Sequence, residues 1–149
     1  MYDPLVSSRQ ARLLYARMFQ PLAQQYDLTQ PEIDILLFLY NNSELNTARD
    51  IAAHRGLAKS NVSTAIDSLR GKGYVRVEDD PHSRRVRRLF LCEEKQPVLL
   101  ELKKCQDGYL YALLNGFTEK EAETLFVLLT RMAENIVAEL TRLGSDADE

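Results

Sequence analysis

A cluster of arginines carries the strongest chemical signal in this sequence. Arg84, Arg85, Arg87 and Arg88 occupy four of five consecutive positions. So many like charges destabilise a folded chain unless an anion neutralises them. The phosphates of nucleic acid, or the narrow minor groove of duplex DNA, are the natural partners of such a cluster. The arginines therefore predict an anion-binding site whose ligand is nucleic acid.

The basic charge is confined to one segment of an acidic chain. Residues 47–91 contain ten Lys and Arg against five Asp and Glu, which gives a net charge of +5. The whole chain of 149 residues carries −3, so the remaining residues carry −8. A basic segment within an acidic protein indicates a localised nucleic-acid footprint more specifically than overall basicity does.

A second candidate surface precedes the arginines. Val62, Ile66 and Leu69 repeat at the spacing of an inward helix stripe. The opposite face carries short polar side chains, which let a helix approach base edges and offer hydrogen bonds to several bases. The residues predicted to contact DNA are Lys59, Ser60, Asn61, Ser63, Thr64 and Ser68 on this helix and Arg84, Arg85, Arg87 and Arg88 beyond it. An ordinary solvated face is the alternative, and the basic segment that follows favours DNA.

Two short helices are needed to hold this polar face. The spacing predicts helices over residues 47–54 and 59–72. Thr47 with Asp50 three residues later approximates a capping box, which satisfies free N–H groups at a helix start. Gly56 stands where the first helix needs a residue that tolerates positive φ at its end.

A β-hairpin is predicted directly after the second helix. Val75 and Val77 alternate with charged residues, which is typical of a half-buried strand over residues 74–78. A turn over residues 79–83, rich in Asp and Pro, separates it from a second strand over 86–91. Helix, turn, helix and hairpin form a winged helix-turn-helix, in which the second helix enters the DNA major groove and the hairpin reaches the adjacent backbone.

The same segment resembles the MarR family of bacterial transcription regulators. The matching stretches are the run LAKSNVSTAIDSLRGKGYV, the strand RVED and the wing DPHSRRVRRLFL. Upstream, Asp27-Leu28-Thr29 is similar to the family's Gly-Leu-Thr entry to its second helix. The resemblance covers nearly the whole chain. It implies a homodimer with interlocking terminal helices, and a small aromatic or phenolic effector that binds where those helices meet the DNA-binding lobe.

Three positions depart from the family pattern. Ser83 stands where the family often has Asp, two residues before the wing arginine that Arg85 matches. Ala58 replaces the Ser or Thr that commonly opens the recognition helix, so its cap must come from elsewhere. Cys92 replaces the Thr that usually ends the second wing strand and caps the next helix.

The expected fold is mainly α-helical with a small β-hairpin wing, a winged helix-turn-helix flanked by dimerisation helices at both ends. One domain, residues 1–149, is expected to contain a DNA-binding lobe at 28–92 and dimerisation helices at 5–27 and 93–143. The terminal helices are more apolar than a small lobe can cover. An enlarged monomer core is one explanation. A homodimer is the other, and a palindromic operator requires a two-fold protein.

Helix ends in the flanking segments are also readable. Thr29 with Glu32 and Thr118 with Glu121 form further capping boxes. Inward residues of the helix after Thr29 are predicted to be Ile33, Leu36, Leu37 and Tyr40. A long helix is predicted over residues 93–115. The last helix is predicted to stop at Gly144, and the acidic tail 145–149 to be disordered.

Aromatic residues form the predicted effector site. The set is Tyr15, Phe19, Tyr26, Phe38, Tyr40 and Tyr109. Aromatic stripes on helices are usually core, so plain packing is the equal alternative.

Other function classes find little support in the sequence. His54 and His82 are the only histidines, and no catalytic triad order, phosphate loop, metal-ligand spacing or cofactor motif stands out, so an enzyme is not expected. Two alternatives remain: a winged-helix module that binds protein, and a regulator that senses oxidants through Cys92 at a helix start, with Cys105 inert. No apolar run reaches membrane-spanning length and no signal pattern opens the chain, so a cytoplasmic protein is expected.

Overall fold

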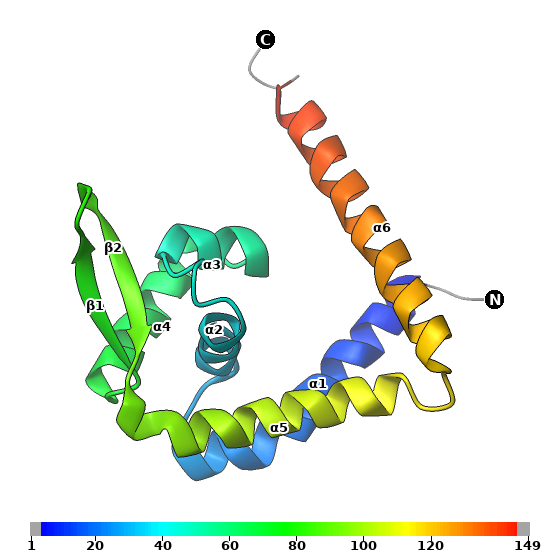
Figure 1. Ribbon diagram of the computed structural model, residues 1–149, viewed down its shortest axis with the longest axis horizontal. Helices are drawn as coiled ribbons and strands as arrows, with labels where there is room; N and C mark the ends of the chain where they lie inside the picture. The colour runs from blue at the N-terminus through cyan, green and yellow to red at the C-terminus, as the bar shows by residue number, and fades with distance from the viewer. Residues whose placement is uncertain (1–3, 146–149) are drawn as a thin grey trace. The chain divides into compact units, whose positions relative to one another are not determined.

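The computed structural model describes residues 4–145, which form helices and one β-hairpin (Figure 1). The elements in chain order are α1 (Pro4–Tyr26), α2 (Gln30–Asn41), α3 (Ala48–Arg55), α4 (Lys59–Gly71), β1 (Val75–Asp80), β2 (Ser83–Leu91), the 3-10 turn η1 (Glu93–Lys95), α5 (Gln96–Leu113) and α6 (Glu119–Ser145). The expected fold class, helices with a two-stranded wing, is confirmed. The chain divides into two compact units, one ending at Tyr109 and the other beginning at Leu110.

Helix α2 forms the centre of the first unit. It contacts α1, α3, α4 and β2. Ile33, Leu36 and Leu37 are buried as predicted, and Ile35, Phe38 and Leu39 are buried as well, whereas Tyr40 is only half-buried. A helix that is apolar all round must be surrounded by other elements. The sequence pattern predicted one inward face, but the structure covers nearly the whole circumference.

Local capping interactions set the starts of three helices. Thr29 and Glu32 bond each other reciprocally before α2, as do Thr47 and Asp50 before α3. In the second unit, the Thr118 N–H donates to Glu121 over 2.8 Å, and the Glu121 N–H donates to the Thr118 hydroxyl over 3.2 Å. All three predicted capping boxes are therefore confirmed.

The hairpin is longer than the sequence predicted. Its strands extend to Asp80 and from Ser83, so the turn narrows from residues 79–83 to Pro81 and His82. In the extended part of β1, Asp79 faces Arg87 and Asp80 accepts a hydrogen bond from Arg88, so opposite charges meet across the two strands. Such cross-strand pairs stabilise a ladder, which explains why charged residues that read as a turn lie in strands. The ladder register shifts between Asp79 and Asp80.

Both ends of α5 and the end of α6 differ from the prediction. The segment after the wing begins with the 3-10 turn η1, and α5 starts only at Gln96 and ends at Leu113, not 115. Pro97 in the first turn of α5 lacks an N–H, which suits a helix start. Helix α6 continues through Gly144 to Ser145, so the predicted stop at Gly144 is wrong. Glycine inside a helix costs about 1 kcal/mol, which the long helix tolerates. The rest of the tail that was predicted to be disordered, residues 146–149, lies outside the described residues.

The turn between α1 and α2 explains one feature of the family resemblance. Asp27 has a φ of 51°, which is the left-handed region that favours glycine. Its neighbour Leu28 donates its N–H to the Ala23 carbonyl over 2.9 Å, which closes the end of α1. Asp27 therefore occupies the position of the family's glycine and adopts the conformation that glycine would adopt.

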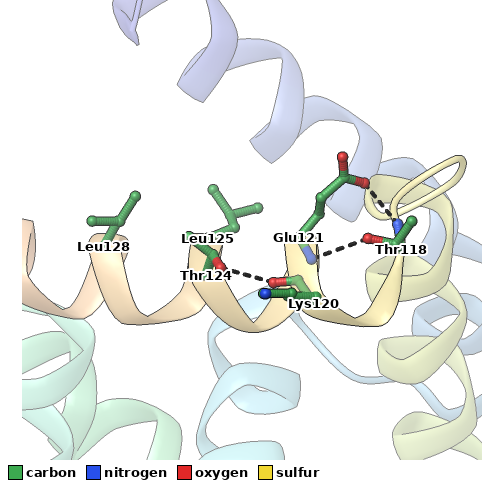
Figure 2. Close-up of a pocket in the computed structure, with 6 residues that line it drawn as sticks. All are labelled: Thr118, Lys120, Glu121, Thr124, Leu125 and Leu128. Atoms are coloured by element: carbon green, nitrogen blue, oxygen red, sulfur yellow. Dashed lines mark hydrogen bonds between the residues drawn. The ribbon is translucent and has the colours of Figure 1, made fainter.

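Helix α6 dominates the second unit and has almost no buried residue. Its apolar side chains lie on the surface: the exposed set is Phe126, Val127, Leu128, Leu129, Met132, Ile136, Val137, Leu140 and Leu143. Figure 2 shows its first turns, where Leu125 and Leu128 project from one side of the helix beside the Thr118–Glu121 capping box. An open hollow of about 440 Å³ lies along these turns. Within residues 4–145, no helix is both long and apolar enough to cross a membrane.

Candidate nucleic-acid interface

Helix α4 is anchored by its apolar stripe and presents its polar face outward. Val62, Ile66 and Leu69 are buried, and α4 packs against α2, α3 and β1. Five of the predicted DNA-contacting side chains on this helix are exposed: Lys59, Ser60, Asn61, Ser63 and Thr64. The inward stripe thus determines which side chains remain available for a ligand.

Two hydroxyl groups on α4 are engaged within the protein. The Thr64 hydroxyl donates to the Ser60 carbonyl over 2.9 Å, so its single O–H is used, although the oxygen can still accept a hydrogen bond. Ser68 is half-buried and hydrogen-bonds the Glu32 carboxylate, one of the interactions that lower the pKa of that acid. Ser68 is consequently less available for DNA than the residues of the first two turns.

The start of α4 has no side-chain cap. Ala58 precedes the helix with extended backbone and makes no capping hydrogen bond, as its departure from the family pattern predicted. The first N–H groups of a helix then need another acceptor, and an anion such as a DNA phosphate suits both their geometry and the helix dipole.

Three wing arginines are available for DNA. Arg84 and Arg85 are exposed, and neither forms an ion pair with any residue that the structure describes. Arg87 lies 3.9 Å from Asp79, and both side chains are more than two-thirds exposed. Such a pair contributes little to stability, so it does not compete strongly with phosphate.

Arg88 differs from its neighbours because two of its donors already bond groups within the protein. Its Nε donates to Asp80 over 2.8 Å, and its Nη1 donates to the Asn46 side chain over 3.0 Å. Sequence reasoning did not single out Asn46, which lies 42 residues earlier in the chain. Its position directly before the Thr47 capping box is a signal that could have drawn attention to it.

A small hollow separates the recognition helix from the wing. It measures about 130 Å³, and both apolar and charged residues line it. The lining residues are Ala48, Ser63, Ile66, Asp67, Arg70, Val77, Arg87 and Leu89. Arg70 and Arg87 place positive charge on either side of this hollow, where a DNA backbone would pass between helix and wing.

A nearly buried ion pair secures the end of α4. Lys72 donates to Glu32 over 3.0 Å and also to the Asp27 carbonyl. Burial raises the pKa of Glu32. Hydrogen bonds from Ser68, Lys72 and the Thr29 N–H lower it, and together they outweigh burial, so the pKa lies below its usual value. This pair ties the end of the recognition helix to the start of α2.

The aromatic residues predicted to bind an effector pack among themselves and the core. Phe19 and Phe38 are buried, and the Tyr15 ring lies 4.6 Å from Phe19 and 5.1 Å from Tyr109 between centroids. Tyr40 packs against the core, and the Tyr26 hydroxyl donates to Glu101 over 2.7 Å. This arrangement agrees with the packing alternative, and effector binding stays a prediction.

Tyr15 also lies at a polar contact between three helices. Its hydroxyl donates to Asp34 over 3.2 Å, and the Gln30 amide donates to the same oxygen over 3.0 Å. Burial raises the pKa of Tyr15 and that of Asp34. Arg55 of α3 donates to the Asp34 carbonyl over 3.4 Å, so α1, α2 and α3 meet here.

The two cysteines lie in different surroundings, and a redox role for Cys92 stays a prediction. Cys92 precedes the η1 turn that leads into α5, and its side chain makes no capping bond there. Cys105 donates to the Met18 carbonyl over 3.4 Å, and burial raises the pKa of its thiol, which disfavours the reactive thiolate. No cluster of His, Cys, Asp or Glu suited to a metal ion occurs in the described part of the chain.

Comparisons with known proteins agree with this geometry. Residues 26–86 match the model of the MarR family. The HTH-type transcriptional regulator YybA of Bacillus subtilis (strain 168) is 26% identical over 110 residues, which span 74% of this chain and 73% of that protein.

Solved structures share the fold. A MarR-family transcriptional regulator from Silicibacter pomeroyi has a TM-score of 0.78 at 21% identity, with 91% of this chain and 90% of that chain covered. BpsR of Bordetella bronchiseptica, described for regulation of its DNA binding by 6-hydroxynicotinic acid, has a TM-score of 0.65 at 19% identity, covering 84% of this chain and 94% of that one.

Proposed function

Because this chain belongs to the MarR family of DNA-binding transcription regulators, we propose that it acts as a homodimeric repressor of a pseudo-palindromic operator. One observation carries the proposal. The exposed polar face of α4 and the exposed arginines Arg84 and Arg85 near the wing tip belong to one compact unit. A helix for the major groove and a cationic hairpin for the adjacent backbone together make a complete DNA-reading surface.

The dimer is proposed from the exposed apolar surface of α6. A stripe of this length on a monomer surface is unusual, since large exposed apolar patches mark interaction sites. A second copy supplies an identical stripe, and a two-fold dimer places two recognition helices on half-sites about one helical turn apart. A dimer bound across a promoter blocks access of RNA polymerase, which is the basis for proposing repression.

The proposal also includes control of DNA binding by a small aromatic effector. BpsR is a structural relative described for regulation of its DNA binding by 6-hydroxynicotinic acid, and the residues around Tyr15 and Tyr109 are aromatic, so they offer stacking partners to a similar ring if they part to admit it. Such a ligand must bind the DNA-competent and DNA-incompetent states with different affinity, because equal affinity shifts nothing. Screening aromatic acids and phenols for compounds that change both melting temperature and operator affinity tests this part.

The DNA-binding part is tested by selection and titration. The wild-type protein selects duplexes from random-sequence DNA, and fluorescence anisotropy then measures affinity at several salt concentrations. Arg85→Ala is expected to weaken binding and to lower the slope of log K against log salt by about one. Unchanged affinity and slope would refute the wing assignment. Failure of the wild-type protein to select any duplex would favour a winged-helix module that binds protein.

A further inference from the structure

Asn46 is a buried polar residue that joins the wing to the linker before α3. Only 5% of its surface is exposed. Its carbonyl accepts the Leu89 N–H over 2.8 Å, and its side-chain N–H donates back to the Leu89 carbonyl over 3.1 Å. The linker thus pairs with β2 at one residue, although the structure forms no third strand there. This bonding leaves the side-chain oxygen of Asn46 as an acceptor directed at the wing.

Arg88 connects this acceptor to the turn of the wing. Its guanidinium bridges the Asn46 oxygen and the Asp80 carboxylate, and the Asp80 side chain is only 11% exposed. The other carboxylate oxygen of Asp80 accepts the His82 N–H over 2.8 Å. Hydrogen bonds from Arg88 and then from His82 lower the pKa of Asp80, so the carboxylate stays charged at neutral pH. A continuous series of bonds therefore runs from the linker to the wing turn.

We propose that Arg88 is a positioning residue, which with Asn46 and Asp80 fixes the angle of the wing and so aims Arg84 and Arg85 at DNA. The inference rests on the proposed DNA-binding function. Apolar contacts at Val75 and Leu89 hold only the base of the hairpin in the core. At ~3.3 Å per residue, five residues separate Leu89 from Arg84 by about 16 Å, so a rotation of about 10° displaces the tip by ~3 Å. Such a displacement is as long as a hydrogen bond to phosphate.

The proposal reverses the effect expected from charge alone. Asp80 is an acid beside a DNA-binding surface, so simple electrostatics predicts that removing its charge strengthens binding to phosphate. If Asp80 holds Arg88, removing its charge instead weakens operator binding. Lysine in place of Arg88 keeps the positive charge, so it could still contact a phosphate. It lacks the planar guanidinium that donates to two acceptors at once, so it could not hold Asn46 and Asp80 together as a clamp.

The experiment compares Asp80→Asn and Arg88→Lys with two controls. The probe is the duplex selected by the wild-type protein, and affinity and salt slope are measured for it and for a scrambled duplex. Both variants are expected to lose about tenfold in operator affinity, equivalent to ~1.4 kcal/mol. The salt slope and the affinity for scrambled DNA should stay close to wild type. Arg87→Ala should lower the slope, and Arg76→Ala, which removes an arginine that stacks on Phe90 of the hairpin, should bind as wild type does.

The possible outcomes separate the two proposals. Tighter or unchanged operator binding by Asp80→Asn, or wild-type affinity for Arg88→Lys, overturns the positioning role and leaves DNA binding intact. A salt slope that is reduced by about one in Arg88→Ala and restored in Arg88→Lys also overturns it, because lysine can replace a phosphate contact but not the clamp. Failure of the wild-type protein to bind any duplex overturns both proposals. Thermal melting of each variant confirms that a loss of affinity does not come from unfolding.

Discussion

Helices α4 and α6 carry similar apolar stripes and meet opposite environments. In α4 the residues Val62, Ile66 and Leu69 are buried by neighbouring elements of the same chain. In α6 the residues Met132, Ile136 and Leu140 repeat at the same kind of spacing, yet each is more than half exposed. Helical periodicity predicts that one face of a helix will be buried, but it does not predict whether the same chain or a partner buries it. The comparison separates residues that stabilise the single chain from residues whose apolar surface calls for a partner.

The largest expected effect contrasts one leucine of α4 with one isoleucine of α6. Leu69 is 0% exposed, whereas Ile136 is 53% exposed. Leu69→Ala removes fully packed atoms and leaves a cavity, so the free energy of unfolding should fall by about 2–5 kcal/mol. Ile136→Ala should cost far less at protein concentrations where the chain is monomeric. Urea unfolding across a range of concentrations measures both, and equal losses in dilute solution would contradict the comparison.

The second effect concerns self-association through α6. Ile136→Glu places a charge in the proposed interface, where it loses hydration without gaining a partner. Each subunit carries the change, so the dimer dissociation constant should rise about a hundredfold, equivalent to ~3 kcal/mol. Sedimentation equilibrium measures it, with Glu134→Ala on the same helix as the control. A dimer unaffected by Ile136→Glu would show that another surface holds the subunits together.

The third prediction is that the capping threonines of α3 and α6 contribute equally to the free energy of unfolding. Thr47 caps α3 and Thr118 caps α6 with the same reciprocal bonds. Because a cap acts within one turn, Thr47→Ala and Thr118→Ala should each cost about 1 kcal/mol, whatever covers the rest of the helix. Helical circular dichroism during thermal unfolding measures the losses, and Thr→Ser at each position should restore most of the stability. A large difference between the two sites would mean that caps, like stripes, depend on tertiary surroundings.

The smallest effect concerns one carboxylate from each unit. Burial raises the pKa of Asp34, so its charged form is less favourable in the folded chain, and stability falls as pH rises from its usual pKa through the raised value. Asp34→Asn should therefore raise the melting temperature at pH 7, with the gain disappearing in acid. Glu139 of α6 has its pKa lowered by the hydrogen bond from Arg142, but its side chain is more than half exposed to solvent, and Glu139→Gln should leave the melting temperature unchanged. A gain for Asp34→Asn that persists in acid would point to packing instead of charge.

Sequence reasoning succeeded where the controlling interaction is short in range. The capping boxes at Thr29, Thr47 and Thr118 each involve residues three positions apart, and all three helices begin as predicted. The inward face of α4 followed from its spacing in the same way. The hairpin was predicted at the correct place but too short. Its outer charged residues are stabilised by contacts with the opposite strand, which the local sequence pattern does not reveal.

By itself, the sequence determined the order of the elements, the polar face of α4 and the concentration of arginine in the wing. These depend on periodicity, caps and composition, which are properties of neighbouring residues. Only the tertiary structure decided that Arg88 bonds Asn46 and Asp80 while Arg84 and Arg85 remain unpaired among the described residues. Four arginines in five positions look alike in sequence. The acceptor that separates Arg88 from the others lies 42 residues away, and folding alone brings it within hydrogen-bonding distance.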